Sequence, residues 1–496
     1  MMVPAVTPFS QDPANFVAVI DIGSNSIRLV VHASRGCYPF PLLNERSNCR
    51  LGLGLGDDGL LKQDRIVAGL TTLGRFAALL ENMGVTRIYP VATAAVRRAA
   101  NAAQFVEPAE AILGRKINVL SQQDEARLVA EGINLNVQSA SGLVADLGGG
   151  SLEIVALQKN VVTASTSFNF GHLSDITANE VTANLAEHKW IAATGASRIY
   201  GVGGSFRALG SAFIEQTDYP LSVLHGLNLP ADTARGMLAS FAQDFPDLTG
   251  VPLGRRRTMP AASVIMGALL DHTGVDKITI TGTSIREGII AEAELNAEQR
   301  ADFLQVVTTE IASMNPRFAG APHALMRLLA PLYGGDYSKL VQGKAGRLER
   351  MVNAACHLAD LCWNEHQDKR GDLAARRVLG LPVNCLTQKE RAWLALAIHH
   401  RYVGGKTSKA LPFDVSAILS RRKRVEATMI GLGLRFALSY SGGIAAGIDY
   451  LTMMSDGTNL TLNVAPKGAA LMDGLAHRRF AQLAESAVLS PKISGI

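Results

Sequence analysis

The 496-residue sequence is poor in cysteine, in aromatic residues and in long hydrophobic runs. Its five cysteines are scattered and none belongs to a Cys-x-x-Cys pair, which argues against a disulfide framework or a structural zinc site. No uninterrupted apolar run approaches the roughly 18 residues that a membrane-spanning helix needs. The net charge of +5 is small for this length, so we expect neither a nucleic-acid-binding tail nor a membrane partner.

The composition that remains is typical of a folded, multidomain protein. Hydrophobic residues make up 48% of the chain and charged residues 18%, which is too apolar for a disordered protein. At roughly 150 residues per domain, the length suggests about three domains. Residues 1–16 contain three prolines and no Lys or Arg, which predicts no secretory signal peptide. We therefore expect a soluble, cytoplasmic protein.

One local pattern occurs twice. The turn Asp-Ile-Gly-Ser-Asn-Ser begins at Asp21, and a similar turn, Asp-Leu-Gly-Gly-Gly-Ser, begins at Asp146. Each lies between short apolar segments that predict strands, at 17–20, 27–31, 143–145 and 152–157. The two aspartates are 125 residues apart, a domain-sized spacing that indicates an internal duplication. The sequence therefore predicts two related α/β lobes that face one another.

The rest of the chain separates into a mixed part and a helical part. Further strands are predicted at 88–92, 117–120, 199–202 and 277–280, and helices at 60–83, after Ser121 and from Arg286. Beyond about 301 the composition predicts packed helices, as at 346–363 and 387–402, followed by an alternating strand at 458–464. The predicted domains are a first lobe at 1–135, a second lobe at 136–304, a helical domain at 305–430 and a small α+β cap at 431–496.

Both turns have the composition of a phosphate-binding loop. Glycine lets backbone N–H groups approach an anion closely, and serine hydroxyls and an asparagine amide add further donors. Ordinary hairpin turns also favour Asp, Asn and Gly, but a pair of such turns at domain spacing favours binding. The predicted phosphate-binding residues are Gly23, Ser24, Asn25 and Ser26 in the first turn and Gly148, Gly149, Gly150 and Ser151 in the second.

Four carboxylates are candidates for the chemistry. Asp146 and Glu153 flank the second turn and could hold one cation, because hard cations prefer oxygen ligands, and Asp21 could do the same at the first turn. Glu125 lies at a predicted helix start and shares the inward, apolar face of that helix, so it is a candidate general base. Solvent-facing carboxylates, or acidic residues that merely favour a helix start, would give the same pattern.

Basic residues and histidines leave more alternatives open. Arg97 or Arg98 could clamp a phosphoryl oxygen, although such arginines are more often surface charges. The runs 255–257 and 421–424 fit solvated faces better than binding sites. The histidines of the helical part, at positions 357, 366, 399 and 400, fit packing or capping better than a metal site, since the chain contains no His-Asp dipeptide.

The segments DIGSNSIRLVV and DLGGGSLEIV, with TAAVRRA and SQQDEARL between them, resemble the exopolyphosphatase / guanosine pentaphosphate phosphatase (Ppx/GppA) family. The likeness extends through Gly171, GVGGS at 201–205 and TSIREGII at 283–290, and so spans both predicted lobes. It implies duplicated actin-like (ribonuclease H-like) lobes of the sugar kinase and Hsp70 superfamily, with a phosphate-binding cleft between them. The C-terminal part is then similar to the helical region of HD phosphohydrolases.

The resemblance also implies roles for individual residues. Glu125 matches the proposed base that activates the attacking water, and Asp146 and Glu153 match the acidic pair assigned to Mg²⁺ and the reacting phosphate. Arg97 matches a phosphate-contacting arginine. The third glycine turn adds Gly203, Gly204 and Ser205 to the predicted phosphate-binding set. Departures from the family pattern include Gln122 and Asp124 just before Glu125, where a glycine and a glutamate are usual.

We therefore expect a hydrolase of phosphoric anhydrides, namely an Mg²⁺-dependent exopolyphosphatase that releases orthophosphate from the ends of inorganic polyphosphate. The same site would serve an alternative substrate, guanosine pentaphosphate (pppGpp), and guanosine tetraphosphate is a related ligand. A superfamily kinase or ATPase and a non-catalytic sensor of polyphosphate or the alarmone are the other hypotheses. Stimulation by a monovalent cation is left open, and a homodimer is expected by analogy with the family.

Overall fold

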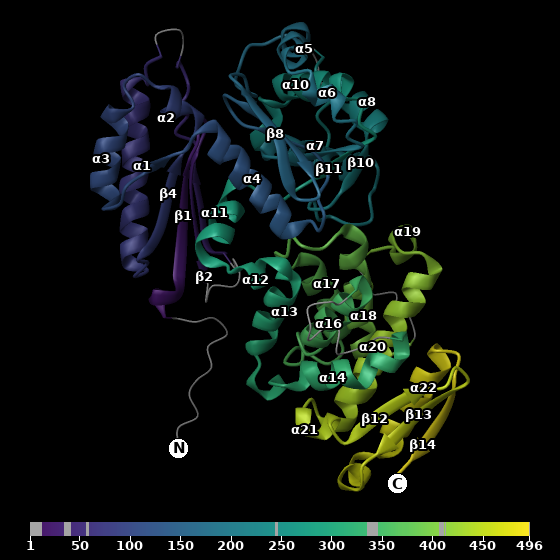
Figure 1. Ribbon diagram of the computed structural model, residues 1–496. Helices are drawn as coiled ribbons and strands as arrows, with labels where there is room; N and C mark the ends of the chain where they lie inside the picture. Colours follow the sequence, from purple (N-terminus) through teal and green to yellow (C-terminus); the bar gives the residue numbers. More distant parts are fainter. Residues whose placement is uncertain are drawn as a thin grey trace. The chain divides into compact units, whose positions relative to one another are not determined.

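The computed structural model describes residues 12–33, 41–55, 59–243, 247–334, 346–405, 411 and 413–495. The first 11 residues, where no signal peptide is predicted, lie outside this range. The chain divides into two compact units, one before and one after residue 302 (Figure 1). Among the described residues, no helix is long and apolar enough to cross a bilayer.

The first lobe is a five-stranded mixed sheet with helices packed on it (Figure 1). The strands are β1 (Phe16–Ile22), β2 (Ile27–Ala33), β3 (Pro41–Ser47), β4 (Arg87–Ala92) and β5 (Asn118–Val119). The helices are α1 (Gln63–Asn82), α2 (Ala94–Arg98), α3 (Ala103–Leu113) and α4 (Gln122–Asn136). Ala18, Ile20 and Ile22 of β1 pack against apolar side chains of α1 and α3, so these two helices cover one face. The strand predicted at 117–120 is only two residues long.

The second lobe has the same central arrangement. Its strands are β6 (Gly142–Leu147), β7 (Leu152–Gln158), β8 (Val161–Phe168), β9 (Arg198–Val202), β10 (Asn228–Pro230) and β11 (Lys277–Ile280). Its helices are α5 (Ala178–Glu187), α6 (Trp190–Ala193), α7 (Gly204–Gln216), α8 (Ala231–Phe241), α9 (Leu253–Arg256), α10 (Met259–Thr273), α11 (Ile285–Glu294) and α12 (Ala297–Ala301).

The strand order confirms the duplication predicted from the two turns. The first sheet runs β3-β2-β1-β4-β5, and the second, read from its β8 edge, runs β8-β7-β6-β9-β11-β10. In each sheet the first strand pairs antiparallel with the second and parallel with the fourth. The two hairpins that carry the glycine turns, β1–β2 and β6–β7, therefore occupy equivalent places in the two lobes.

Helices α4 and α11 lie between the two sheets and share one apolar core with both. This core includes Val19 of β1, Val144 of β6, Leu128 of α4 and Ile289 of α11, all buried. The two helices cross in backbone contact, because a Cβ at Gly288 would lie 1.9 Å from the Leu128 carbonyl oxygen. Their first turns carry Glu125 and Arg286, so the crossing sets where these side chains lie.

The second unit is a helical body that ends in a three-stranded sheet. Its main helices are α13 (Phe303–Ser313), α14 (Ala321–Leu329), α16 (Arg347–Leu358), α17 (Arg370–Gly380), α18 (Gln388–Val403), α20 (Arg421–Ser441) and α22 (Gly474–Ser486). The sheet is β12 (Leu451–Ser455), β13 (Asn459–Val464) and β14 (Ser490–Ser494), in that order. Helix α20 runs through residue 430, so the predicted boundary between helical domain and cap falls inside a helix.

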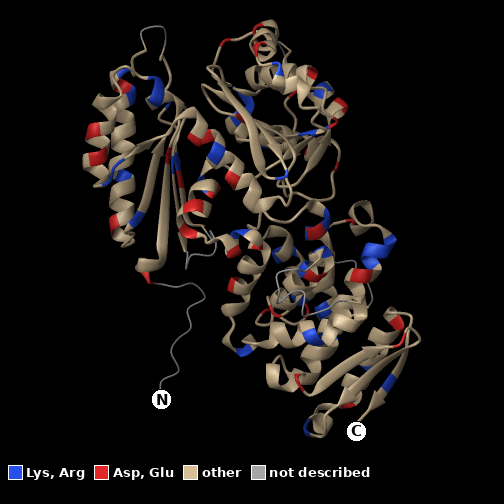
Figure 2. Cartoon of the chain, viewed as in Figure 1, with Lys and Arg blue, Asp and Glu red and all other residues tan. Residues whose placement is uncertain are grey.

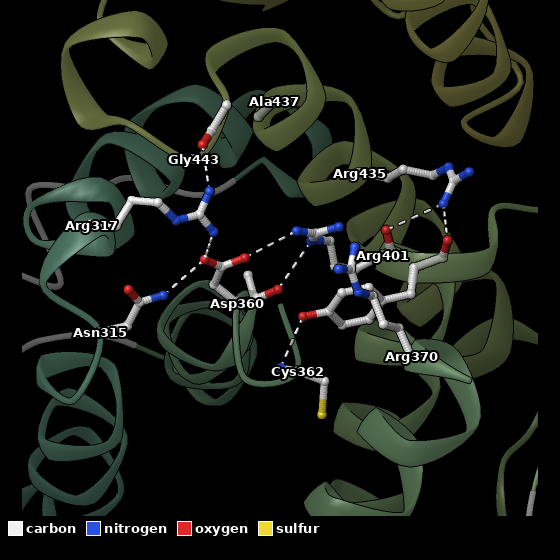
Figure 3. Close-up of polar contacts among 12 residues, drawn as sticks. Asn315, Arg317, Asp360, Cys362, Arg370, Arg401, Arg435, Ala437 and Gly443 are labelled. Carbon is white, nitrogen blue, oxygen red and sulfur yellow. Dashed lines mark hydrogen bonds and ion pairs between the residues drawn. The ribbon is translucent and has the colours of Figure 1, made fainter. Parts of the chain in front are cut away.

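A buried carboxylate joins several parts of this second unit (Figure 3). Only 2% of the Asp360 side chain is exposed, and it accepts hydrogen bonds from Arg401 Nη2 at 3.1 Å and from the Asn315 amide at 3.0 Å. It also pairs with Arg317, whose guanidinium donates to the Gly442 carbonyl at 2.7 Å. A buried charge is stable only with its partners, so we expect this cluster to hold these segments of the second unit together.

Candidate active site

A cavity of about 180 Å³ lies between the two lobes, at the ends of the duplicated hairpins. Both glycine turns contribute to it, together with Asp21, Glu125, Asp146 and Glu153. Of the predicted phosphate-binding residues, Gly23, Ser24, Asn25, Ser26, Gly148, Gly149, Ser151, Gly203 and Gly204 line it. Gly150, Ser205 and Arg97 do not. The structure thus brings residues from both halves of the sequence to one place.

The two turns have the same backbone geometry and face one another. The amide of Gly23 donates to the Ser26 carbonyl at 3.1 Å, and the amide of Gly148 donates to the Ser151 carbonyl at 2.9 Å. A Cβ at Gly149 would lie 3.1 Å from the Asn25 Cβ, so the turns of the two lobes are in contact. Their approach depends on the absence of a side chain at this glycine.

A segment after β8 supports the second turn from behind. The carbonyls of Gly148 and Gly149 accept hydrogen bonds from the amides of His172 at 3.1 Å and Leu173 at 2.9 Å. A Cβ at Gly171 would lie 2.6 Å from both carbonyl oxygens, which explains the glycine at that position. Pairing these carbonyls matters because unpaired oxygens beside the cavity would repel an anionic ligand.

Two carboxylates face one another across the second hairpin. Asp146 and Glu153 are cross-strand partners on β6 and β7 that line the cavity, where Glu153 is buried and Asp146 is partly buried. Burial and the nearby Glu125 carboxylate raise the pKa of Asp146 to about 7. Burial, Glu125 and Asp146 raise the pKa of Glu153 well above its ordinary value. Burial is the largest cause of both shifts, and repulsion among the clustered carboxylates adds to it.

Glu125 is held by Arg97, which has a different place from the one predicted. The guanidinium Nη1 of Arg97 donates to Glu125 Oε2 at 2.7 Å and to the Leu120 carbonyl at 3.0 Å. Only 11% of the Glu125 side chain is exposed. Burial raises the pKa of Glu125, while the Arg97 hydrogen bond and charge act in the opposite direction. Arg97 therefore orients the candidate base and does not line the cavity itself.

The first lobe carries arginines where the second lobe carries Glu153 and a serine. Asp21, Arg28 and Arg46 form one row across β1, β2 and β3, where the equivalent row in the second lobe is Asp146, Glu153 and a serine. Arg28 and Arg46 lie directly opposite each other, and like charges in that position destabilise a sheet. Asp21 Oδ2 lies 3.7 Å from Arg286 Nη1. The pKa of Asp21 is raised, and burial is the largest cause.

The cavity is also lined by five arginines that the sequence alone did not identify as phosphate-binding, namely Arg28, Arg46, Arg207, Arg255 and Arg286. Burial and mutual repulsion lower the pKa of Arg28 and of Arg255 to about 10, so both guanidinium groups remain charged near neutral pH. Lys, Arg, Asp and Glu are interspersed over the helices of both lobes (Figure 2), whereas the cavity gathers five arginines and four carboxylates in one place.

The position of one of the five arginines, Arg28, could have been predicted from the sequence. Aligning the two turns places Arg28 at the position of Glu153, two residues after the last serine of its turn. The parity argument that directs Glu153 toward the turn therefore applies to Arg28 as well. The other four come from separate strands and helices, and Arg255 belongs to a run that looked solvent-facing. Only their convergence in three dimensions identifies them.

The third glycine turn packs against the acidic pair. Gly203 has φ of +95°, which favours glycine, and a Cβ there would lie 3.0 Å from Asp146 Oδ1. Ser205 is buried, and its hydroxyl lies 3.5 Å from His172 Nδ1. Gly203 thus allows β9 and α7 to approach the Asp146 carboxylate closely.

The buried histidines of helices α16 and α18 contact backbone carbonyls, whereas His366 is exposed beside Asp368. His399 Nδ1 lies 3.1 Å from the Gly371 carbonyl, and His357 Nδ1 lies 2.9 Å from the Asn353 carbonyl. Burial lowers the pKa of His357 and of His400 to about 4. Within the described residues, no group of three or more His, Cys, Asp or Glu side chains is placed to hold a metal ion.

Comparison with known proteins agrees with this geometry. The sequence profile of the Ppx/GppA phosphatase family matches residues 29–297, and the profile of the exopolyphosphatase C-terminal region matches residues 336–491. The crystal structure of an exopolyphosphatase from Cytophaga hutchinsonii ATCC 33406 superposes with a TM-score of 0.50 at 21% identity, over 55% of this chain and 96% of that one. At that identity the likeness is one of fold, and it agrees with the two α/β lobes described above.

A curated relative gives a sequence match at higher identity. The guanosine-5'-triphosphate,3'-diphosphate pyrophosphatase of Pseudoalteromonas translucida (strain TAC 125) is 29% identical over 300 residues. These residues are 56% of this chain and 59% of the relative. The chain therefore matches little more than half the length of this relative.

Proposed function

The chain belongs to the Ppx/GppA phosphatase family, and from this membership and the cavity we propose that it hydrolyses the terminal phosphoric anhydride bond of inorganic polyphosphate. The observation that carries the proposal is the division of charge in the cavity. Asp146 and Glu153 come from the second hairpin, Glu125 from the start of α4 and Asp21 from β1, whereas the arginines converge from β2, β3 and three helices. A terminal phosphoryl group needs both, because catalysis of phosphoryl transfer is mostly positioning and charge neutralisation.

Glu125 is the proposed general base. A water oxygen forms a bond to the terminal phosphorus, and the water proton passes to Glu125. The bond between that phosphorus and the bridging oxygen breaks, and the bridging oxygen leaves with the shortened chain. Arg97 holds the Glu125 carboxylate in one orientation at 2.7 Å, and burial raises its pKa toward the range in which a base can accept a proton.

The acidic pair fits a divalent cation. Asp146 and Glu153 are cross-strand partners, and the charges of Glu125 and Asp146 add to burial in raising the pKa of Glu153, a repulsion that a bound cation relieves. Mg²⁺ commonly takes only one or two protein carboxylates and completes its shell with water and phosphate oxygens. We propose Asp146 and Glu153 as its ligands, with Asp21 at the edge of the site. When bound, Mg²⁺ would neutralise charge on the departing phosphate.

A second candidate function is hydrolysis of guanosine pentaphosphate. It is favoured by the name of the curated relative and by the same terminal anhydride in both substrates. The cavity residues named above contact only the phosphate end, so the mechanism is unchanged. We further propose that the protein is cytoplasmic and that it forms a homodimer. Light scattering of the purified chain tests the homodimer directly.

Phosphate release from long-chain polyphosphate and from guanosine pentaphosphate, measured side by side with Mg²⁺, tests the proposal. The Glu125→Gln variant keeps an oxygen for Arg97 but loses the base, so kcat should fall by about a hundredfold or more. Glu131→Gln, on the same helix, is the matched control and should retain activity. Release from neither substrate by the wild-type protein would overturn the proposal, and more than about a tenth of kcat in Glu125→Gln would overturn the role of that residue.

A further inference from the structure

A second and larger cavity, of about 930 Å³, adjoins the first. The residues that line both are Asn25, Arg28, Arg46, His172, Gly204, Arg207 and Arg255. The larger cavity adds Arg50 and Arg257, and among the described residues its only acidic lining residue is the exposed Asp175. The carboxylates of the proposed chemistry line only the smaller cavity. A ligand that extends from the smaller cavity into the larger one therefore passes from a mixed to a strongly positive environment.

Arg255 lies at the junction of the two cavities, where its guanidinium packs against Gly204. It belongs to the short helix α9 and lines both spaces. A Cβ at Gly204, the first residue of α7, would lie 2.0 Å from Arg255 Nη2 and 2.3 Å from its Cζ. The guanidinium therefore occupies the space that any other residue at position 204 would need, and Gly204 acts as its seat.

The charge of Arg255 is not compensated by the protein around it. No carboxylate in the described part of the chain forms an ion pair with its guanidinium, and the charged groups that affect its pKa are Arg46 and Arg207. A half-buried guanidinium held among other cations is costly in isolation and becomes favourable when an anion binds. Its neighbours Arg256 and Arg257 are exposed, and Arg256 lines neither cavity. The three consecutive arginines therefore have different environments, and only Arg255 lines both cavities.

We propose that Arg255 binds the phosphate on the leaving side of the scissile bond, next to the terminal phosphate, and that Gly204 is required to seat it there. This inference rests on the proposed function and adds a subsite to it. The terminal phosphate lies among the glycine turns and carboxylates, and the next phosphate lies at the junction. Planar, bidentate contact suits a phosphate in this place, and Arg255 opposes the charge that develops as the bridging oxygen leaves.

Calorimetric titration of the full chain without Mg²⁺, using tripolyphosphate and orthophosphate as the two probes, separates the subsites. We expect Arg255→Ala to weaken tripolyphosphate binding by about tenfold to a hundredfold, the usual effect of losing a charged hydrogen bond. Orthophosphate binding should change by less than about threefold, because the glycine turns hold the terminal phosphate. Arg256→Ala, on the same helix but outside both cavities, is the matched control and should bind both probes normally.

Substitution of Gly204 provides an independent test. Gly204→Ala should displace the guanidinium and weaken tripolyphosphate binding in the same way, and the double variant should be no weaker than Arg255→Ala alone. Arg255→Lys should recover part of the binding, since it keeps the charge without the planar fork. Equal loss of both probes in Arg255→Ala, or additive effects in the double variant, would overturn the inference. Melting temperatures confirm that each variant is folded.

Catalysis distinguishes failure of this inference from failure of the proposed function. With polyphosphate and Mg²⁺, Arg255→Ala should lower kcat/KM by a factor similar to its loss of tripolyphosphate binding. A wild-type chain that binds tripolyphosphate through Arg255 but hydrolyses nothing would overturn the proposed activity and leave the subsite intact. A wild-type chain that hydrolyses polyphosphate while Arg255→Ala retains normal kinetics would overturn only the subsite.

Discussion

Arg28 and Glu153 occupy the same position in two duplicated hairpins and carry opposite charges. Each lies directly across its hairpin from an aspartate, Asp21 in the first lobe and Asp146 in the second. The two residues line the same cavity, so this one position gives one hairpin a basic side chain and the other an acidic one. The difference supplies one hairpin suited to phosphate oxygens and one suited to a cation, and the two face each other across the same cavity.

The opposite charges predict separable effects of neutralising each residue. Arg28→Gln should raise KM for polyphosphate by about tenfold or more, because it removes a charged contact to phosphate, and should leave the Mg²⁺ concentration for half-maximal activity nearly unchanged. Glu153→Gln should instead raise the required Mg²⁺ concentration by about tenfold or more. Steady-state kinetics with Mg²⁺ and polyphosphate varied independently provide the measurement, and identical effects from both variants would contradict it.

The stabilisation of the protein by Mg²⁺ should depend on pH. The pKa of Asp146 is raised to about 7, so the folded protein holds a proton that the unfolded chain has already released. This contribution stabilises the fold below about pH 4 and is lost as the pH rises to about 7. Above pH 7 Asp146 is deprotonated and its charge repels the neighbouring carboxylates, and a cation relieves that repulsion.

Thermal melts at pH 5.5 and pH 8, with and without Mg²⁺, check this expectation. The increase in Tm caused by Mg²⁺ should be larger at pH 8, and Asp146→Asn should remove most of the difference. An equal increase at both pH values, or an unchanged one in Asp146→Asn, would show that the acidic pair is not the cation site.

The crossing of α4 and α11 should be sensitive to a single methyl group. Gly288→Ala places a Cβ 1.9 Å from the Leu128 carbonyl oxygen, so the helices must separate, at a cost of about 1–3 kcal/mol. Because their first turns carry Glu125 and Arg286, kcat should also fall. Gly236→Ala, in α8 with no atom within 4 Å of the new Cβ, is the control and should stabilise the protein slightly. Urea denaturation and kcat together test the idea, which an unperturbed Gly288→Ala would refute.

The buried carboxylate of the second unit should be important for stability. Asp360→Asn keeps the shape of the side chain but leaves Arg317 and Arg401 without their charge partner, and breaking such a buried pair costs about 3–5 kcal/mol. Asp372→Asn breaks a more exposed pair with Arg376 and should cost about 0.5 kcal/mol or less. Denaturant unfolding of the full chain gives both values, and comparable losses would contradict the structural role of Asp360.

The features predicted correctly from the sequence are those encoded over short stretches of chain. The two hairpins, the helix that begins after Ser121 and the duplication of the lobes follow from turn composition and periodicity, and all are present in the structure. The metal and phosphate roles of individual residues stay predictions. Arg97 shows the limit of local patterns, because the sequence predicted a contact with phosphate, whereas its contact with Glu125 depends on how α2 and α4 pack.

The sequence by itself therefore determined the duplicated hairpins, the glycine turns and the carboxylates that accompany them, because each depends on residues within a few positions of one another. Tertiary structure alone decided which arginines complete the cavity. Arg46, Arg207, Arg255 and Arg286 lie on four different elements, spread over 240 residues of sequence. No local pattern distinguishes them from surface arginines, since their positions depend on the packing of two sheets around α4 and α11 and on glycines that allow close approach.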